Sequence, residues 1–80
     1  MARLVCVEIN EDAKPLKEFK HPHQAVYLLG AEDYGIPEKI LNENIVIQIE
    51  SPESHCLNVS TSGSIIMYDR FIKNGKVEIP

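Results

Sequence analysis

Two segments of the chain combine glycine, acidic and amide residues in patterns that suit ligand binding. The first runs from Gly30 to Gly35 as Gly-Ala-Glu-Asp-Tyr-Gly, and glycines at such points let a ligand approach the backbone closely. The carboxylate of Glu32 would repel a pyrophosphate. It suits a cation such as a sulfonium or an arginine, or the hydroxyl group of a substrate. The Gly-x-Glu-x-x-Gly spacing is a weak variant of the dinucleotide fingerprint and, taken alone, is better explained by two turn glycines.

The second segment, 51–60, follows an apolar run and contains His55, Cys56 and Asn58. Asn58 suits the start of the last helix as a cap, and its carboxamide equally suits holding a ligand or a catalytic partner. His55 and Cys56 are adjacent, and adjacent side chains seldom point at each other, so we do not expect a cysteine nucleophile. The serine-rich stretch 60–64 lacks the Gly-x-Ser-x-Gly elbow of serine hydrolases.

The elements that position these segments follow from three short apolar runs. The predicted strands are 4–9, 25–29 and 45–49. They are rich in β-branched residues and nearly continuous, as in strands of a parallel sheet covered on both faces. Ligands of open α/β sheets bind beyond the carboxyl ends of the strands. We therefore expect an α/β fold with a parallel sheet and flanking helices, whose loops after each strand form the site.

Helix-like pieces are predicted between and after these strands, in the order β-α-β-α-β-α. They cover 12–19, 37–41 and 57–73. In the last one, Ile65, Tyr68 and Ile72 recur at helical spacing and form an apolar face. The small residues 60–64 favour close approach of another segment or a ligand to the backbone. Asn74-Gly75 ends the helix, and 75–80 is expected to be a frayed tail of this single domain, 1–80.

Composition limits the partners. A net charge of −4 does not supply the concentrated positive charge that a phosphate backbone attracts. No apolar run approaches the roughly 20 residues that span a bilayer. Two cysteines, in apolar surroundings, suggest a reducing compartment and hence the cytoplasm. His21-Pro-His23 lacks further ligands and makes a poor metal site, so no metal is expected.

Two motifs give the chain a family resemblance. Tyr27-Leu-Leu-Gly-Ala-Glu-Asp-Tyr-Gly-Ile-Pro37 resembles the second signature motif of the SpoU (TrmH) branch of the SPOUT methyltransferases. Cys56-Leu-Asn-Val-Ser-Thr-Ser-Gly-Ser-Ile-Ile-Met-Tyr-Asp-Arg70 resembles the third. The likeness extends from Leu4 to about Phe71. It implies a deep trefoil knot, a bent S-adenosylmethionine held by knot-loop backbone groups, and a homodimer that involves the last helix.

The resemblance also implies roles for individual residues. Matching positions gives Gly30, Ile49 and Leu57 as cofactor contacts. Glu32 and Asn58 match polar residues that support a catalytic arginine of a first motif. That motif would precede Leu4, and Arg3 is no substitute because it lacks the motif's Asn and Gly companions. Two further departures are Glu50, where the family has a proline after Ile49, and Cys56, where it has a serine.

The expected function is thus S-adenosylmethionine-dependent 2′-O-methylation of RNA ribose, in tRNA or rRNA, with S-adenosylhomocysteine as the other product. The chain corresponds to the cofactor-binding C-terminal portion of such an enzyme and is expected to be inactive alone. The alternative is a non-catalytic S-adenosylmethionine-binding or dimerisation module that acts as a regulator or assembly partner. A receiver-like domain is a weaker alternative, because the clustered early acidic residues that bind its magnesium are missing.

Overall fold

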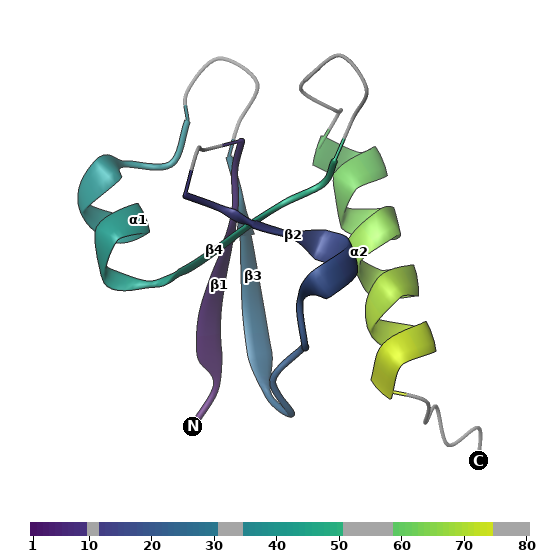
Figure 1. Ribbon diagram of the computed structural model, residues 1–80. Helices are drawn as coiled ribbons and strands as arrows, with labels where there is room; N and C mark the ends of the chain where they lie inside the picture. Colours follow the sequence, from purple (N-terminus) through teal and green to yellow (C-terminus); the bar gives the residue numbers. More distant parts are fainter. Residues whose placement is uncertain (10–11, 31–34, 51–58, 75–80) are drawn as a thin grey trace.

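Four parallel strands form the centre of the computed structural model, which describes residues 1–9, 12–30, 35–50 and 59–74 (Figure 1). The strands are β1 (Arg3–Val7), β2 (Lys14–Pro15), β3 (Ala25–Leu29) and β4 (Ile45–Gln48). They lie in the order β2-β4-β1-β3, and each pairing is parallel. The α/β fold with a parallel sheet is therefore confirmed.

The burial of the strands explains their apolar sequences. Val5 and Cys6 of β1 and Ile47 of β4 are fully buried, since these two strands lie inside the sheet. β3 lies at one edge, and its Val26 is 55% exposed. The three predicted strands are confirmed, although β1 and β4 end before the predicted residues 9 and 49.

The predicted helix at 12–19 is wrong. The chain forms β2 and then a single 3-10 turn, η1 (Leu16–Glu18). Lys14 pairs with Ile47 of β4, and Pro15 is extended at φ −60° and ψ 137°. Proline has no N–H to donate, so it suits an edge strand, and β2 is the other edge of the sheet.

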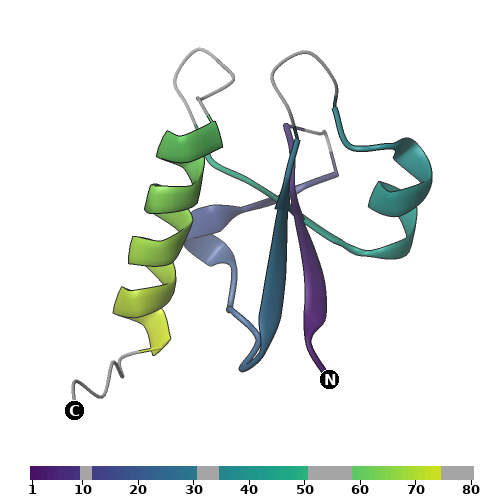
Figure 2. The same cartoon turned by 180° about the vertical axis from the view of Figure 1, so that it is seen from behind.

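The other two helices are confirmed with small shifts. α1 (Glu38–Glu43) begins directly after Pro37 and extends two residues beyond the predicted end. The side chain of Asn44 donates a hydrogen bond to the carbonyl of Ile40 at 2.8 Å and ends this helix. α2 (Val59–Asn74) is the longest element and packs against β3 and η1. Figures 1 and 2 show α1 and α2 on opposite sides of the strands.

One apolar core joins the sheet to the last helix. Its buried members are Val5, Leu16, Phe19, Ile47 and Ile66. The core covers only part of the predicted apolar face of α2, because four large apolar side chains remain exposed. These are Met67, Tyr68, Phe71 and Ile72, each at least half exposed. We call these four residues the α2 apolar patch.

Some expectations fall on residues outside the described ranges. A knot would involve segment 51–58, which precedes α2, and the tail 75–80 follows it. The close backbone approach predicted for 60–64 finds no counterpart at Gly63, where an added Cβ would meet none of the described atoms within 4 Å. Among the described helices, none has the length and apolar character needed to cross a membrane.

Candidate cofactor site

The carboxyl ends of β4, β1 and β3 lie side by side at one end of the sheet. We refer to this row of strand ends as the carboxyl edge, to distinguish it from the edge strands β2 and β3. Val7 pairs with Leu29 on one side and with Ile47 on the other. The next residue along β1 and β3 is Glu8 and Gly30 respectively, so these two come together. Ile49 follows the end of β4 at the same edge and packs on the core. The register therefore places Gly30 and Ile49, two of the three predicted cofactor contacts, at the same end of the sheet on either side of β1.

Glu8 is the polar residue of this edge that the sequence analysis did not single out. Its carboxylate Oε2 accepts a hydrogen bond from the backbone N–H of Ile36 at 2.6 Å. Its own N–H donates to the carbonyl of Ile47 at 3.0 Å. Glu8 thus connects the end of β4 with the segment that follows β3. The available signal was its position as the single charged residue in the apolar run 4–9.

The two predicted glycines are explained by the same carboxylate. A Cβ at Gly35 would lie 3.0 Å from Oε2 of Glu8, and one at Gly30 would lie 3.3 Å from it. A side chain at either glycine would therefore crowd the carboxylate, which would have to shift to make room. The close approach to these glycines is made by the side chain of Glu8, and the prediction that a ligand approaches them stays a prediction.

The electrostatic character of this edge is negative. Burial raises the pKa of the Cys6 thiol above its ordinary value of 9.0, and the negative charge of Glu8 raises it further. Cys6 is buried and carries no disulfide. A half-buried carboxylate next to Gly30 suits a cationic ligand and disfavours a pyrophosphate, because burial weakens the screening of its charge. The donor set thus fits a sulfonium cofactor better than a dinucleotide.

Several predicted site residues lie outside the described residues. They are Glu32, Leu57 and Asn58, together with Tyr34, His55 and Cys56. Arg3 is described, and it occupies the amino end of β1, where its N–H donates to the carbonyl of Gln24. That is the opposite end of β1 from Glu8, so Arg3 does not belong to the candidate site.

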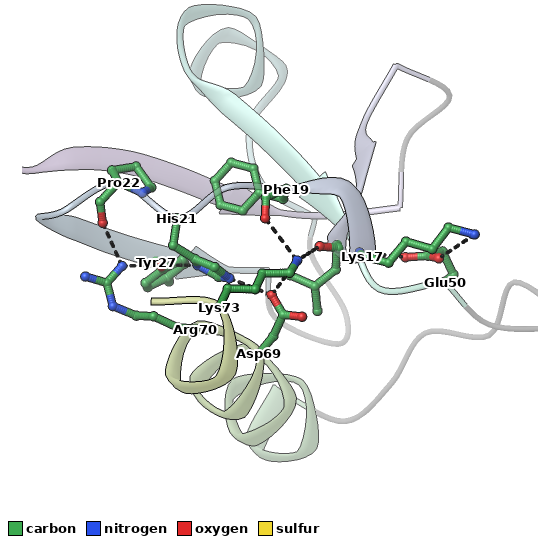
Figure 3. A network of polar contacts seen from close by, with 10 residues as sticks. Lys17, Phe19, His21, Pro22, Tyr27, Glu50, Asp69, Arg70 and Lys73 are labelled. Atoms are coloured by element: carbon green, nitrogen blue, oxygen red, sulfur yellow. Dashed lines mark hydrogen bonds and ion pairs between the residues drawn. The ribbon is translucent and has the colours of Figure 1, made fainter. Parts of the chain in front are cut away.

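A second polar cluster lies near the amino end of β3 (Figure 3). The buried ring of His21 has Nδ1 2.6 Å from the hydroxyl of Tyr27 and Nε2 2.6 Å from Oδ2 of Asp69. Lys73 also pairs with Asp69, at 2.9 Å. We call His21, Tyr27, Asp69, Arg70 and Lys73 the His21 cluster.

The His21 cluster fastens the C-terminal half of α2 to the segment before β3. Arg70 donates to the carbonyls of Pro22 and His23 at 2.8 and 2.7 Å, and to the Tyr27 hydroxyl at 2.9 Å. Lys73 donates to the carbonyls of Leu16 and Phe19. These bonds occupy the groups of the cluster with one another and with backbone, so its role is structural.

The charge of Asp69 is stabilised by its neighbours. Burial alone would raise its pKa, but hydrogen bonds from Lys73 and His21, and their positive charge, outweigh this effect and lower the pKa below its ordinary 3.8. His21 is therefore a satisfied internal histidine. Within the described ranges, no group of three or more His, Cys, Asp or Glu side chains is placed to hold a metal ion.

Comparison with known proteins connects this geometry to a family. The sequence model of the SpoU rRNA Methylase family matches residues 2–68 of the 80. The chain belongs to the SpoU rRNA methylase family. A search of curated proteins finds no match. The family resemblance of the two motifs is thus confirmed.

Membership of the SpoU family has general consequences for fold and chemistry. SpoU proteins are S-adenosylmethionine-dependent RNA methyltransferases with a SPOUT fold, and the four-stranded parallel sheet agrees with that fold. The matched residues include Gly30 to Gly35 and Ile49. The edge formed by Glu8, Gly30 and Ile49 is therefore the candidate cofactor site.

Proposed function

We propose that the chain binds S-adenosylmethionine at the carboxyl ends of β3, β1 and β4 and is the cofactor-binding portion of an RNA ribose 2′-O-methyltransferase. The observation that supports this most is the register that places Gly30 beside Glu8, with Ile49 at the same edge. Two of these residues match cofactor contacts of the family. The third adds negative charge where a sulfonium would be favoured.

The chemistry requires more than this edge. S-adenosylmethionine supplies the methyl group, and the ribose 2′-hydroxyl must be positioned in line and relieved of its proton. Glu32 and Asn58 are proposed to support that step. Arg3 lies at the end of β1 opposite the proposed site, so we do not assign it the role of the family's first-motif arginine. We therefore expect the 80-residue chain to be inactive, or nearly so, by itself.

Substrate binding by this chain alone is expected to be weak. Its net charge is −4, and among the described residues three of the cations contact other groups of the chain. Arg70 and Lys73 bind backbone carbonyls, and Lys17 pairs with Glu50 at 3.6 Å. The rest of the electrostatic attraction for tRNA or rRNA must come from elsewhere. The buried thiol of Cys6 supports a reducing, cytoplasmic setting.

The α2 apolar patch supports a homodimer as part of the proposal. Four large apolar side chains on one helix are an unusual cluster for the surface of a monomer. The same patch favours the second candidate function, a non-catalytic module that dimerises or assembles with a partner. The two candidates differ in catalysis, and a module that only dimerises differs from the enzyme also in cofactor binding at the strand ends.

Calorimetry with S-adenosylmethionine tests the proposal. The wild-type chain is expected to bind it, and Gly30→Val is expected to weaken binding at least about tenfold, since a side chain there meets Glu8 and Ile36. Val26→Ala is the control, because Val26 lies on the same strand with an exposed side chain. A folded wild-type chain that binds no cofactor would contradict the proposal. The dimerisation or assembly module would then be the remaining candidate function.

A methylation assay tests the claim of inactivity. Labelled methyl transfer is measured with tRNA and with rRNA as acceptors, and no transfer above background is expected from the chain alone. Substantial ribose methylation by the chain would show that residues within it replace the first-motif arginine.

A further inference from the structure

We propose that Glu8 is the positioning residue of the cofactor site and sets its preference for a positively charged cofactor. This inference rests on the proposed function. It assigns a role to the carboxylate of Glu8. This residue directly follows β1, the strand that lies between β3 and β4, and it belongs to neither family motif. Glu8 holds the backbone of Ile36 in place, and its charge lies beside Gly30, which the cofactor is proposed to contact.

One hydrogen bond and two glycines define the positioning role. Oε2 of Glu8 accepts the N–H of Ile36 at 2.6 Å, and a Cβ added at Gly35 or Gly30 would lie 3.0 or 3.3 Å from the same oxygen. The carboxylate therefore lies where a side chain at Gly30 or Gly35 would crowd it. Glu8 is itself held by β4, through its N–H bond to Ile47.

The residue type matters for both parts of the role. A hydrogen bond from a backbone N–H to a carboxylate is roughly twice as strong as one to a neutral acceptor. Glutamine keeps the length and one acceptor oxygen but loses the charge. Aspartate keeps the charge but is one methylene shorter, so it retracts from Ile36. The two substitutions thus separate charge from reach.

The charge has a consequence for ligand choice. A cofactor in contact with Gly30 lies within the field of Glu8, which is half-buried and only partly screened. S-adenosylmethionine carries a sulfonium charge, and S-adenosylhomocysteine is the uncharged thioether with otherwise the same groups. Glu8 therefore favours the substrate form over the product form and aids release of the product.

The positioning role is tested by nuclear magnetic resonance of the chain without any ligand. The Ile36 amide proton is expected far downfield and protected from solvent exchange in the wild type. It is expected upfield and less protected in Glu8→Ala and Glu8→Asp. Glu18→Gln is the control, since Glu18 is an exposed acid in η1. An Ile36 amide that keeps its shift and protection in Glu8→Ala overturns the positioning role.

The charge preference is tested by the affinities for S-adenosylmethionine and S-adenosylhomocysteine. Glu8→Gln is expected to reduce the ratio of the two affinities by about threefold or more, as expected for loss of one nearby charge. Glu8→Asp is expected to weaken both ligands by about tenfold and to keep their ratio, because charge remains while the hydrogen bond is lost. Glu18→Gln is expected to change neither value.

The outcomes separate this inference from the proposed function. A wild type that binds neither ligand contradicts the proposed function and with it the charge preference, while the Ile36 amide still decides the positioning role. A wild type that binds both, with the ratio unchanged in Glu8→Gln, overturns the charge preference. If Glu8→Asp binds both ligands with wild-type affinity, the claim that the carboxylate must extend as far as Ile36 is overturned.

Discussion

Nε2 of His21 lies 2.6 Å from Oδ2 of Asp69, and this contact ties the segment before β3 to the last helix. The hydrogen atoms of the contact follow from its neighbours. Arg70 can only donate, so the Tyr27 oxygen accepts from it. Ionised Asp69 can only accept, so Nε2 of His21 carries a hydrogen directed to it, and in the neutral ring Nδ1 then accepts from the Tyr27 hydroxyl.

The first prediction concerns this tautomer. When neutral, His21 is expected to be almost entirely in the Nε2–H form, because the Tyr27 hydroxyl occupies Nδ1. Nitrogen-15 spectra of the histidine side chains distinguish the two forms. His23 is the internal control, since it is exposed and should show a mixture. A predominant Nδ1–H form for His21 would contradict the hydrogen-bond assignment.

The second prediction concerns Tyr27. Tyr27→Phe removes the acceptor of one Arg70 bond and leaves a buried ring nitrogen of His21 without its partner. An unsatisfied buried polar group costs about 1–3 kcal/mol, so the free energy of unfolding should fall by that amount. Urea unfolding measures it. Tyr68→Phe is the matched control, because Tyr68 is 65% exposed and lies outside the His21 cluster.

The third prediction concerns pH. The pKa of Asp69 is lower in the folded chain than its ordinary 3.8, so the unfolded chain takes up this proton first. Asp69 therefore stabilises the fold above about pH 4, and that contribution is lost as pH falls through the folded pKa. Asp69→Asn should lower stability at neutral pH by about 1–3 kcal/mol and by less in acid.

Unfolding measured as a function of pH tests this dependence. The curves of the wild type and of Asp69→Asn should approach each other as the pH falls below about 4, because the unfolded carboxyl is protonated there while the folded carboxyl stays ionised to lower pH. Glu18→Gln should run parallel to the wild type, since Glu18 is exposed. A constant difference between Asp69→Asn and the wild type at all pH values would contradict the assignment.

The fourth prediction concerns the proposed homodimer. Phe71 and Tyr68 lie with ring centroids 6.5 Å apart at the centre of the α2 apolar patch. Phe71→Glu places a charge there and should convert the dimer to a monomer without loss of helix content. Sedimentation velocity measures the state. Val26→Glu is the control, because Val26 is an exposed apolar residue of β3 outside the α2 apolar patch. A wild-type monomer at high concentration would exclude this interface.

The sheet and the last helix were predictable because their signals are local. Runs of β-branched residues identify buried strands, and the apolar spacing from Ile65 to Ile72 identifies α2. The segment 12–19 was mispredicted because Asp12 suits a helix cap and Leu16 and Phe19 are spaced for one face of a helix. Pairing of Lys14 and Pro15 with β4 decides its actual conformation, and this partner is distant in sequence.

The two glycines of the candidate site could be predicted from the sequence, but the position of the Glu8 carboxylate beside them could not. Gly30 and Gly35 stand out in sequence because the family motif and the turn pattern both mark them. Glu8 belongs to a different strand, and only the register of β1 with β3 brings it to them. The same holds for His21 and Asp69, whose contact depends on how α2 packs on the sheet. Glu32, Leu57 and Asn58 stay predictions.

The parallel arrangement of the described strands has a consequence for how the chain folds. β1 is flanked by β3 and β4, with Val5 paired to Tyr27 and to Ile45, so neither pairing can begin from a hairpin. The chain must lose the entropy of closing a long loop before each strand pairing can form and stabilise it, and this slows folding. Until α2 docks, the apolar faces of β1 and β4 are open to solvent. Folding intermediates of this chain should therefore aggregate more readily than its native state.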